Sequence, residues 1–184
     1  LRSRRILERD VITFFVEPAD NDYLTTRLLW NYDRLRAFCW SSAQALEKYI
    51  KAALLLNGKS AKFSHNFATL GYPELKEIDK DLLPETISIP ETRPFTGYDS
   101  KSKESTVGCL MRFQNNGAPS SRYGESGFLI ESHDIHLLDS LCFMLRRLCI
   151  NLESLHNGEP WREVLRLNPK IQHEFHFDSL DPRR

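Results

Sequence analysis

The strongest pattern of hydrophobic and polar positions lies between about Arg34 and Leu56. Apolar side chains recur there every three or four residues, the spacing that places side chains on one face of an α-helix. That face comprises Cys39, Ala43, Leu46, Tyr49, Ile50, Ala53 and Leu56, with Asn57 at its end. The opposite face carries Gln44, Glu47, Lys48 and Lys51. Because Asn57-Gly58 is a C-terminal signature, the pattern predicts one long amphipathic helix that stops at Leu56.

A second long helix is predicted from His133 to about His156, with Ser132 as its N-cap. Its core face consists of Leu137, Leu138, Leu141, Met144, Leu145, Leu148, Leu152 and Leu155. Phe143 and Ile150 point away from that face and are seven residues apart. Because a second apolar stripe generally needs a second partner, we predict that Phe143 and Ile150 lie in an interface. The N-terminal arm, the long loop and another subunit are alternative partners for this stripe.

Weaker patterns precede the first long helix. Residues 11–16, VITFFV, are β-branched and aromatic, which predicts an edge strand or an apolar arm that ends at Glu17-Pro18. A helix is then expected from about Asp22. Its apolar stripe consists of Tyr23, Leu24, Leu28 and Leu29.

Glycine and proline divide the chain after the first long helix. A third helix is predicted at 64–70, with Ser64 as its N-cap, and Gly71 and Pro73 break it. A short helical piece is expected at 74–83.

These patterns together predict an all-α fold, an up-and-down bundle of four to five helices with a long irregular loop before the last helix. The loop is expected at 88–125, which is rich in Pro, Gly, Ser, Thr and Asn, with a short strand at about 107–113 as an alternative within it. A chain of 184 residues has the usual size of one domain. We divide it into an N-terminal arm at 1–19, a helical bundle at 20–157 and a C-terminal extension at 158–184.

Composition narrows the classes of partner. The chain has 25 Lys and Arg and 25 Asp and Glu, so its net charge gives no global argument for binding nucleic acid or an anionic membrane. The apolar run of the last helix is interrupted by Asp139, Arg146, Arg147 and Glu153, which is typical of a core helix and not of a membrane span. No secretion signal is recognised at the N-terminus. We therefore expect a cytoplasmic protein with no membrane partner.

Cysteines and histidines give no strong signal for a metal or a cofactor. The cysteines are Cys39, Cys109, Cys142 and Cys149. They contain no CxxC pair, so we expect reduced core residues. Two histidine pairs have i,i+3 spacing, His133/His136 and His173/His176. Because a metal site needs three or four converging ligands and each pair supplies two, we expect no metal, and we also expect no cofactor.

Short motifs in the first long helix and beyond it resemble the HEPN domain family. The motifs are Gln44-Ala45-Leu46-Glu47-Lys48, Lys51-Ala52, His65-Asn66-Phe67 and Arg122-Tyr123. Gly124 follows the last of them, where the family usually has proline. The resemblance covers about residues 20–156. It implies an up-and-down helical bundle, commonly a homodimer, in a bacterial or archaeal cytosol.

The HEPN resemblance also implies a choice of functions. Its members include toxin-like metal-independent ribonucleases, companions of minimal nucleotidyltransferases, and domains proposed to bind nucleotides or RNA. The ribonucleases carry an arginine, four to six further residues and a histidine near the start of the last helix. Here Arg122 lies too far from His133, and Arg147 too far from His156. The resemblance therefore favours a homodimeric nucleotide-, RNA- or partner-binding module over an enzyme, with a nucleotidyltransferase or an antitoxin as the candidate partner.

The candidate ligand-binding residues are Glu47, Lys48, Lys51, Lys59, His65, Arg122 and Tyr123. Lysines suit phosphate, His65 is a neutral donor or a general acid, and Arg122 beside Tyr123 suits phosphate and base contacts. The competing interpretation is a solvated helix face with Glu47 and Lys51 as an i,i+4 pair, and an arginine that caps the bundle. Two alternative functions are kept. One is a metal-independent ribonuclease using His65 and nearby basic residues, and the other is a purely structural interaction subunit.

Overall fold

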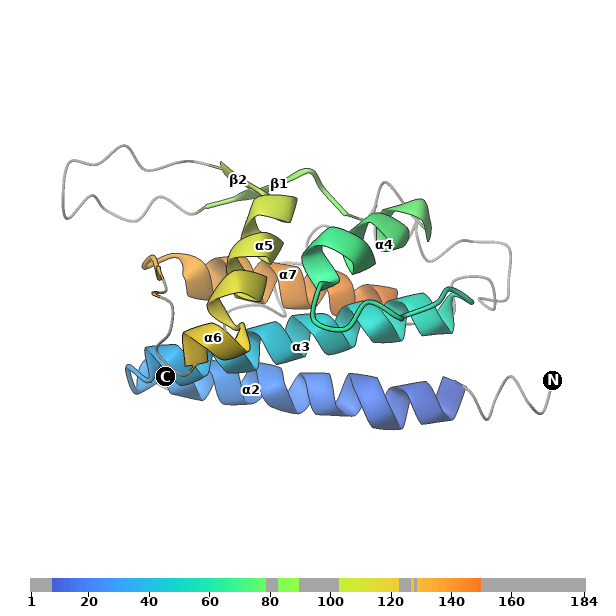
Figure 1. Cartoon of the computed structure of the whole chain (residues 1–184), viewed down its shortest axis with the longest axis horizontal. Helices are drawn as coiled ribbons and strands as arrows, with labels where there is room; N and C mark the ends of the chain where they lie inside the picture. The colour runs from blue at the N-terminus through green and yellow to red at the C-terminus, as the bar shows by residue number, and fades with distance from the viewer. Residues whose placement is uncertain (1–7, 79–82, 90–102, 123–126, 128, 150–184) are drawn as a thin grey trace. The chain divides into compact units, whose positions relative to one another are not determined.

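A computed structural model describes residues 8–78, 83–89, 103–122, 127 and 129–149. Of these residues, 73% are helical, and they form a bundle with one small hairpin (Figure 1). The all-α prediction is therefore confirmed. The described residues all belong to one compact unit. The elements are η1 Ile12–Val16, α2 Glu17–Asn31, α3 Leu35–Leu56, η2 Phe67–Gly71, α4 Tyr72–Ile78, β1 Thr86–Ser88, β2 Lys103–Ser105, α5 Thr106–Asn116, α6 Pro119–Arg122 and α7 Asp134–Leu148.

Helix α3 is the central helix of the described bundle. It begins and ends within one residue of its predicted bounds, and it contacts η1, α2, α4, α5, α6 and α7. Its predicted apolar face is buried, and Ala45, Ala52 and Leu54 outside that face are buried too, because neighbouring elements cover more than one side of the helix. The helix ends as predicted, since the side chain of Asn57 donates to the Ala53 carbonyl at 2.8 Å and Gly58 has a φ of +72°.

The segment before α3 corrects one expectation. The strand predicted at 11–16 is wrong, because residues 8–31 are helical throughout and 12–16 form the π-helical turn η1. Pro18 does not end the helix, because it lies in the first turn of α2, where a missing N–H removes no helical hydrogen bond. The backbone N–H of Glu17 bonds to the carbonyl of Ile12 in the wider π pattern. Val11 and Val16 therefore enter the core from a helix.

The break predicted at Gly71 and Pro73 is also wrong. The π-helical turn η2 runs directly into α4, and Pro73 again lies in the first turn of a helix, where it is tolerated. Gly71 is required by packing, because a Cβ atom there would lie 2.9 Å from Ile50 Cγ2 and 3.0 Å from the ring of Phe63. Ser64 does not cap this helix, whose N-cap is Asn66.

The long irregular loop predicted at 88–125 contains two helices, and its alternative strand at 107–113 is wrong. Helix α5 covers that stretch, and Ser105 Oγ caps it by accepting from Gly108 N at 3.4 Å. The buried residues of α5 are Thr106, Cys109, Leu110 and Phe113, which follow helical spacing. Strands β1 and β2 pair antiparallel, with Ile87 opposite Glu104. Helix α6 is tied to α3 by the Arg36 guanidinium, which donates to the Ser121 carbonyl at 2.9 Å.

Helix α7 starts at Asp134, one residue after the predicted start, and packs on α3 and α2. Its N-cap is His133 and not Ser132, and the Asp134 carboxylate accepts from the Glu131 backbone N–H at 3.0 Å. The predicted core face is buried at Leu137, Leu138, Leu141, Leu145 and Leu148. The rest of the predicted helix, with Ile150, Leu152 and Leu155, lies outside the described residues. No helix in the described part of the chain is long and apolar enough to cross a membrane.

Candidate functional site

The polar face of α3 carries a compact group of three side chains, Glu47, Lys51 and His65, which we call the Glu47 group. The Glu47 side chain is only 9% exposed. Its Oε1 accepts from Lys51 Nζ at 2.6 Å, and its Oε2 lies 2.9 Å from His65 Nδ1. Helix α3 supplies the first two residues, and the turn before η2 supplies the third. The structure therefore brings together three of the seven predicted ligand-binding residues.

A tight turn presents His65 to Glu47. Phe63 and Phe67 are buried on either side of it, and Asn66 N donates to the Phe63 carbonyl at 3.0 Å. Ser64 has a φ of +49°, in the left-handed region that side-chain-bearing residues rarely adopt. The imidazole itself is 65% exposed. Because an ionised carboxylate can only accept, a hydrogen bond in this contact requires a proton on Nδ1.

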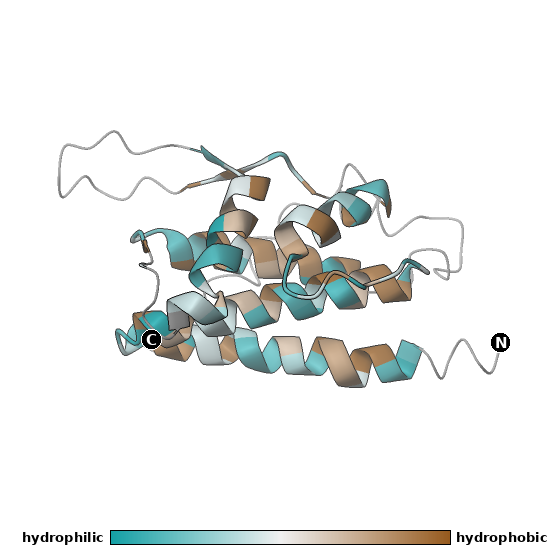
Figure 2. Ribbon diagram, in the orientation of Figure 1, coloured by the Kyte–Doolittle hydropathy of each residue, from teal (hydrophilic) through white to brown (hydrophobic). Residues whose placement is uncertain are grey.

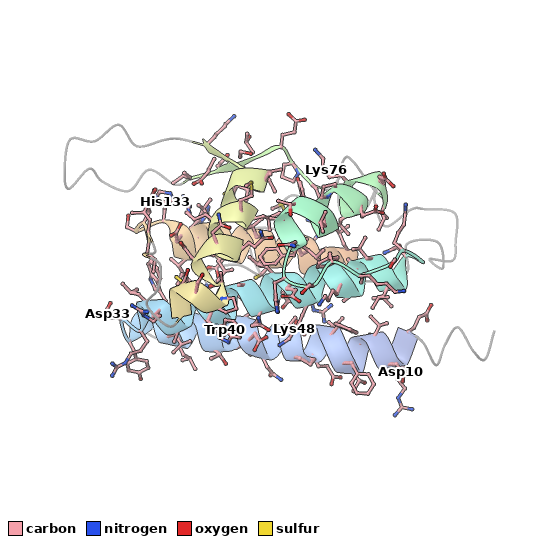
Figure 3. All side chains as sticks on the ribbon, viewed as in Figure 1. Asp10, Asp33, Trp40, Lys48, Lys76 and His133 are labelled. Carbon is pink, nitrogen blue, oxygen red and sulfur yellow. The ribbon has the colours of Figure 1, made fainter. Side chains whose placement is uncertain are left out.

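The other predicted cations lie elsewhere. Lys48, which Figure 3 labels between α2 and α3, pairs with the Asp22 carboxylate of α2. Lys59 Nζ lies 2.9 Å from Glu77 Oε2 and 4.0 Å from Glu74 Oε2, both on α4. Each of these lysines thus faces a carboxylate, as Lys51 does, and the predicted anion site stays a prediction. Arg122 ends α6, but its side chain and the whole of Tyr123 lie outside the described residues.

A second charged group was not predicted from the sequence. Arg112 on α5 forms a forked ion pair with Glu104 of β2, at 2.9 and 3.1 Å, and reaches Asp134 Oδ1 at 2.6 Å. His133 Nε2 lies 3.0 Å from Glu131 Oε2 and 3.6 Å from Glu104 Oε2. Burial raises the pKa of Asp134, while the Glu131 amide and Arg112 oppose that rise. These five residues come from two stretches of the chain, 104–112 and 131–134, and only the fold brings the two stretches together.

The family model of the HEPN domain matches residues 12–93, which run from η1 through β1. Residues 12–93 belong to the HEPN domain family. The chain matched no curated protein and no solved structure. HEPN domains are associated with nucleotidyltransferase and toxin–antitoxin systems and with ribonuclease activity.

The HEPN match contains the whole Glu47 group, since α3 and the turn before η2 both lie within it. Helices α5 and α7 lie beyond it and still complete the core, because Cys109, Leu110 and Phe113 on α5 and Leu137 and Leu141 on α7 are buried in the same cluster. The HEPN match therefore comprises the elements from η1 to β1, and α5 and α7 pack on these elements in one shared core.

Two polar clusters hold α2 of the HEPN domain in place. Tyr23 donates to Asp139 Oδ1 at 2.7 Å, and Arg27 forms an ion pair with the other oxygen of the same buried carboxylate on α7. Asp20 accepts from Tyr49 of α3 at 2.6 Å and from Arg146 of α7 at 2.9 Å. Burial, followed by the Asp139 charge, raises the pKa of Tyr23. These clusters tie α2 to α3 and α7.

Only part of the apolar stripe predicted on α2 of the HEPN domain packs against the core. Tyr23 and Leu29 pack against the core, whereas Leu24 is 47% and Leu28 is 57% exposed. Hydrophobic positions along α2 are visible beside those of α3 in Figure 2. Tyr32 at the end of the helix is 74% exposed, and Phe14 in η1 is 68% exposed. We call Leu24, Leu28 and Tyr32 the α2 face.

Of the two predicted interface residues, Phe143 and Ile150, only Phe143 is described. Phe143 is half-buried, with its ring centroid 5.3 Å from the guanidinium of Arg147, and Ile150 lies outside the described residues. Within the described part of the HEPN domain and the helices that follow it, no group of three His, Cys, Asp or Glu residues could hold a metal ion. The four cysteines are buried and unpaired, and burial raises the pKa of Cys39, Cys109 and Cys149 to about 12.

Proposed function

We propose that this HEPN-domain protein is an interaction module that forms a homodimer through the α2 face and binds a partner protein in that form. The observation that supports it is the exposed stripe of Leu24, Leu28 and Tyr32, which recur every four residues. Eight residues of α-helix span about 12 Å, enough for a continuous contact along one helix. A row of large exposed apolar side chains on a helix is typical of an interaction site.

The charges at the ends of the α2 face favour a second copy of the chain as the occupant. Exposed Glu17 lies at the start of α2, and exposed Arg34 lies just after its end. If two α2 helices pack antiparallel about a twofold axis, the acidic end of one meets the basic end of the other. Such a contact is self-complementary, so the same surface serves both protomers.

The paired lysines favour a protein over an anionic ligand as the further partner. Lys48, Lys51 and Lys59 each face a carboxylate in the described structure, so they add little net positive charge to the surface. A nucleotidyltransferase or an antitoxin is the class of partner that the family association supports. Binding of a nucleotide or RNA is the competing expectation.

Analytical ultracentrifugation tests the dimer. We expect the full chain to sediment as a dimer at micromolar concentration, and Leu28→Lys to sediment as a monomer because it places a charge at the centre of the stripe. Leu70→Lys is the matched control, since Leu70 is 53% exposed on η2, away from the α2 face. A monomeric wild-type protein, or a dimeric Leu28→Lys variant, would overturn the proposal.

A second candidate function is a metal-independent ribonuclease at His65. The observation that favours it is the exposed imidazole whose Nδ1 is bound by a buried carboxylate, an arrangement suited to general acid–base chemistry. The test is incubation of the protein with total RNA in the presence of a chelator. Cleavage that His65→Ala abolishes would support the ribonuclease, and equal cleavage by the variant would exclude His65.

A further inference from the structure

We infer that Glu47 is a positioning residue for His65, holding the imidazole in a single tautomer with Nδ1 protonated and Nε2 presented to solvent as a proton acceptor. The catalytic meaning of this inference rests on the second candidate function above. The positioning itself is a property of the folded protein, and it can be measured without any substrate.

The two oxygens of Glu47 have separate partners. Lys51 Nζ lies 2.6 Å from Oε1, so Oε2 is the oxygen that meets His65 Nδ1 at 2.9 Å. Lys51 is itself placed against the ring of Phe63, 5.4 Å from the ring centroid. The lysine therefore compensates the charge of the poorly exposed carboxylate and fixes its plane. Of the two neutral tautomers of His65, only the one with a proton on Nδ1 can donate to this carboxylate.

The backbone around His65 is equally constrained. Buried Phe63 and Phe67 anchor the turn on both sides, and Gln114 of α5 accepts from the Ala68 backbone N–H at 2.8 Å. The left-handed conformation of Ser64 is unfavourable for a residue with a side chain, and such conformations are retained where the surroundings impose them. The turn thus holds an exposed imidazole beside a carboxylate on the neighbouring helix.

Stability alone gives little reason for this contact. An ion pair or hydrogen bond to a side chain that is 65% exposed is weakened by water, so the imidazole contributes little to the fold. What the contact does determine is which ring nitrogen is basic. A histidine oriented by a carboxylate through one nitrogen, with the other nitrogen open to solvent, has the arrangement that general bases use in enzymes.

The chemistry at Nε2 can be written for an RNA strand. The proton of a ribose 2′-hydroxyl passes to Nε2, the 2′-oxygen bonds to the adjacent phosphorus, and the bond from phosphorus to the 5′-oxygen breaks. The departing 5′-oxygen takes a proton from water, and the imidazolium returns its proton to the resulting hydroxide. The products are a 2′,3′-cyclic phosphate and a 5′-hydroxyl, with no metal or second substrate consumed.

The imidazole ¹⁵N chemical shifts of the full chain test the positioning directly. At mildly alkaline pH, where imidazoles are neutral, we expect wild-type His65 to show a protonated Nδ1 and an unprotonated Nε2. Glu47→Gln should shift His65 toward the Nε2–H tautomer, because an amide can donate as well as accept. Glu77→Gln is the matched control, since it removes an exposed carboxylate that pairs with Lys59 instead.

Each result decides the inference. An Nε2–H tautomer in the wild-type protein would overturn the inference, and so would an unchanged tautomer in Glu47→Gln. If the variant fails to fold, the tautomer in the wild-type spectrum decides the inference. If the wild-type protein cleaves RNA, Glu47→Gln should lower the rate at least about tenfold and Glu77→Gln should not. An unchanged rate would overturn the catalytic role. If the protein cleaves no RNA while the tautomer follows the expectation, the positioning stands and the ribonuclease proposal fails.

Discussion

Gly117 offers a stringent test of how closely α5 packs on α3. It caps the C-terminal end of α5 with a φ of −90°, a conformation that any residue adopts, so an alanine there meets only a steric problem. A Cβ atom would lie 2.3 Å from Ala43 Cβ and 2.8 Å from the Cys39 carbonyl oxygen. Carbon atoms in contact are normally about 3.5–4.0 Å apart, so the new methyl group and Ala43 must separate by about 1.2–1.7 Å.

The expected loss of stability for Gly117→Ala follows from that clash. Overpacking of a well-packed contact typically lowers the free energy of unfolding by about 1–3 kcal/mol. For a chain of this size each kcal/mol corresponds to about 2–4 °C in the unfolding midpoint. This cost alone corresponds to a fall of about 2–12 °C. A less flexible unfolded chain returns about 0.4–1 kcal/mol, so we expect a net fall of no more than about 10 °C.

Gly108→Ala is the control in the same helix. A Cβ atom there would lie 3.5 Å from Ser105 Cβ, an ordinary contact, and the position is within the helix. Alanine is favoured over glycine in a helix by about 0.5–1 kcal/mol, so this variant should be as stable as the wild type or more stable. Both substitutions replace glycine by alanine, and they should change the free energy of unfolding in opposite directions.

Urea unfolding followed by circular dichroism measures both variants. Ala43→Gly removes the atom nearest to the new methyl group, so the double variant Ala43→Gly with Gly117→Ala should lose less stability than the sum of the two single variants. If Gly117→Ala unfolds at the same urea concentration as Gly108→Ala, α5 does not approach α3 this closely and the packing described above is wrong.

Two further predictions concern buried polar groups. Asp139→Asn removes the charge that faces Arg27 and should lower the free energy of unfolding by about 2–4 kcal/mol. Asp20→Asn, at the more exposed pair with Arg146, should lower it by about 1 kcal/mol or less. Thermal denaturation compares the two variants, and equal losses of stability would contradict the argument from burial. Burial raises the pKa of the Cys39, Cys109 and Cys149 thiols to about 12, so the folded chain keeps protons that the unfolded chain loses from about pH 9 upward. The stability that these thiols contribute is therefore complete below pH 9 and is lost as the pH rises toward 12. We expect the urea midpoint to be lower at pH 10 than at pH 7, and an unchanged midpoint would refute this.

Local patterns in the sequence were sufficient for the long helices. The apolar face of α3 repeats at helical spacing and ends at Gly58 with a φ of +72°, so periodicity and glycine chemistry agree there. The same holds for Leu137 to Leu148 on α7. The short motifs around Glu47 and His65 were sufficient to indicate the HEPN family, which the family comparison confirmed over residues 12–93.

Local signals failed where a residue's usual preference is overridden by its neighbours. Pro18 and Pro73 suggested breaks, yet each lies in the first turn of a helix that follows a π-helical turn. Gly108 suggested a loop or strand within a stretch that is helical, because Cys109 and Phe113 bury their side chains in the core. Burial of apolar surface outweighs the weak propensity of one glycine or proline.

The sequence by itself determined the all-α class, the two long amphipathic helices and the family, because each of these depends on residues close together in the chain. Only the tertiary structure decided which charges meet. It paired Lys48 with Asp22 and Lys59 with Glu77, and it placed His65 on Glu47. A side chain's electrostatic partner depends on the packing of separate elements, and no spacing along one helix records it.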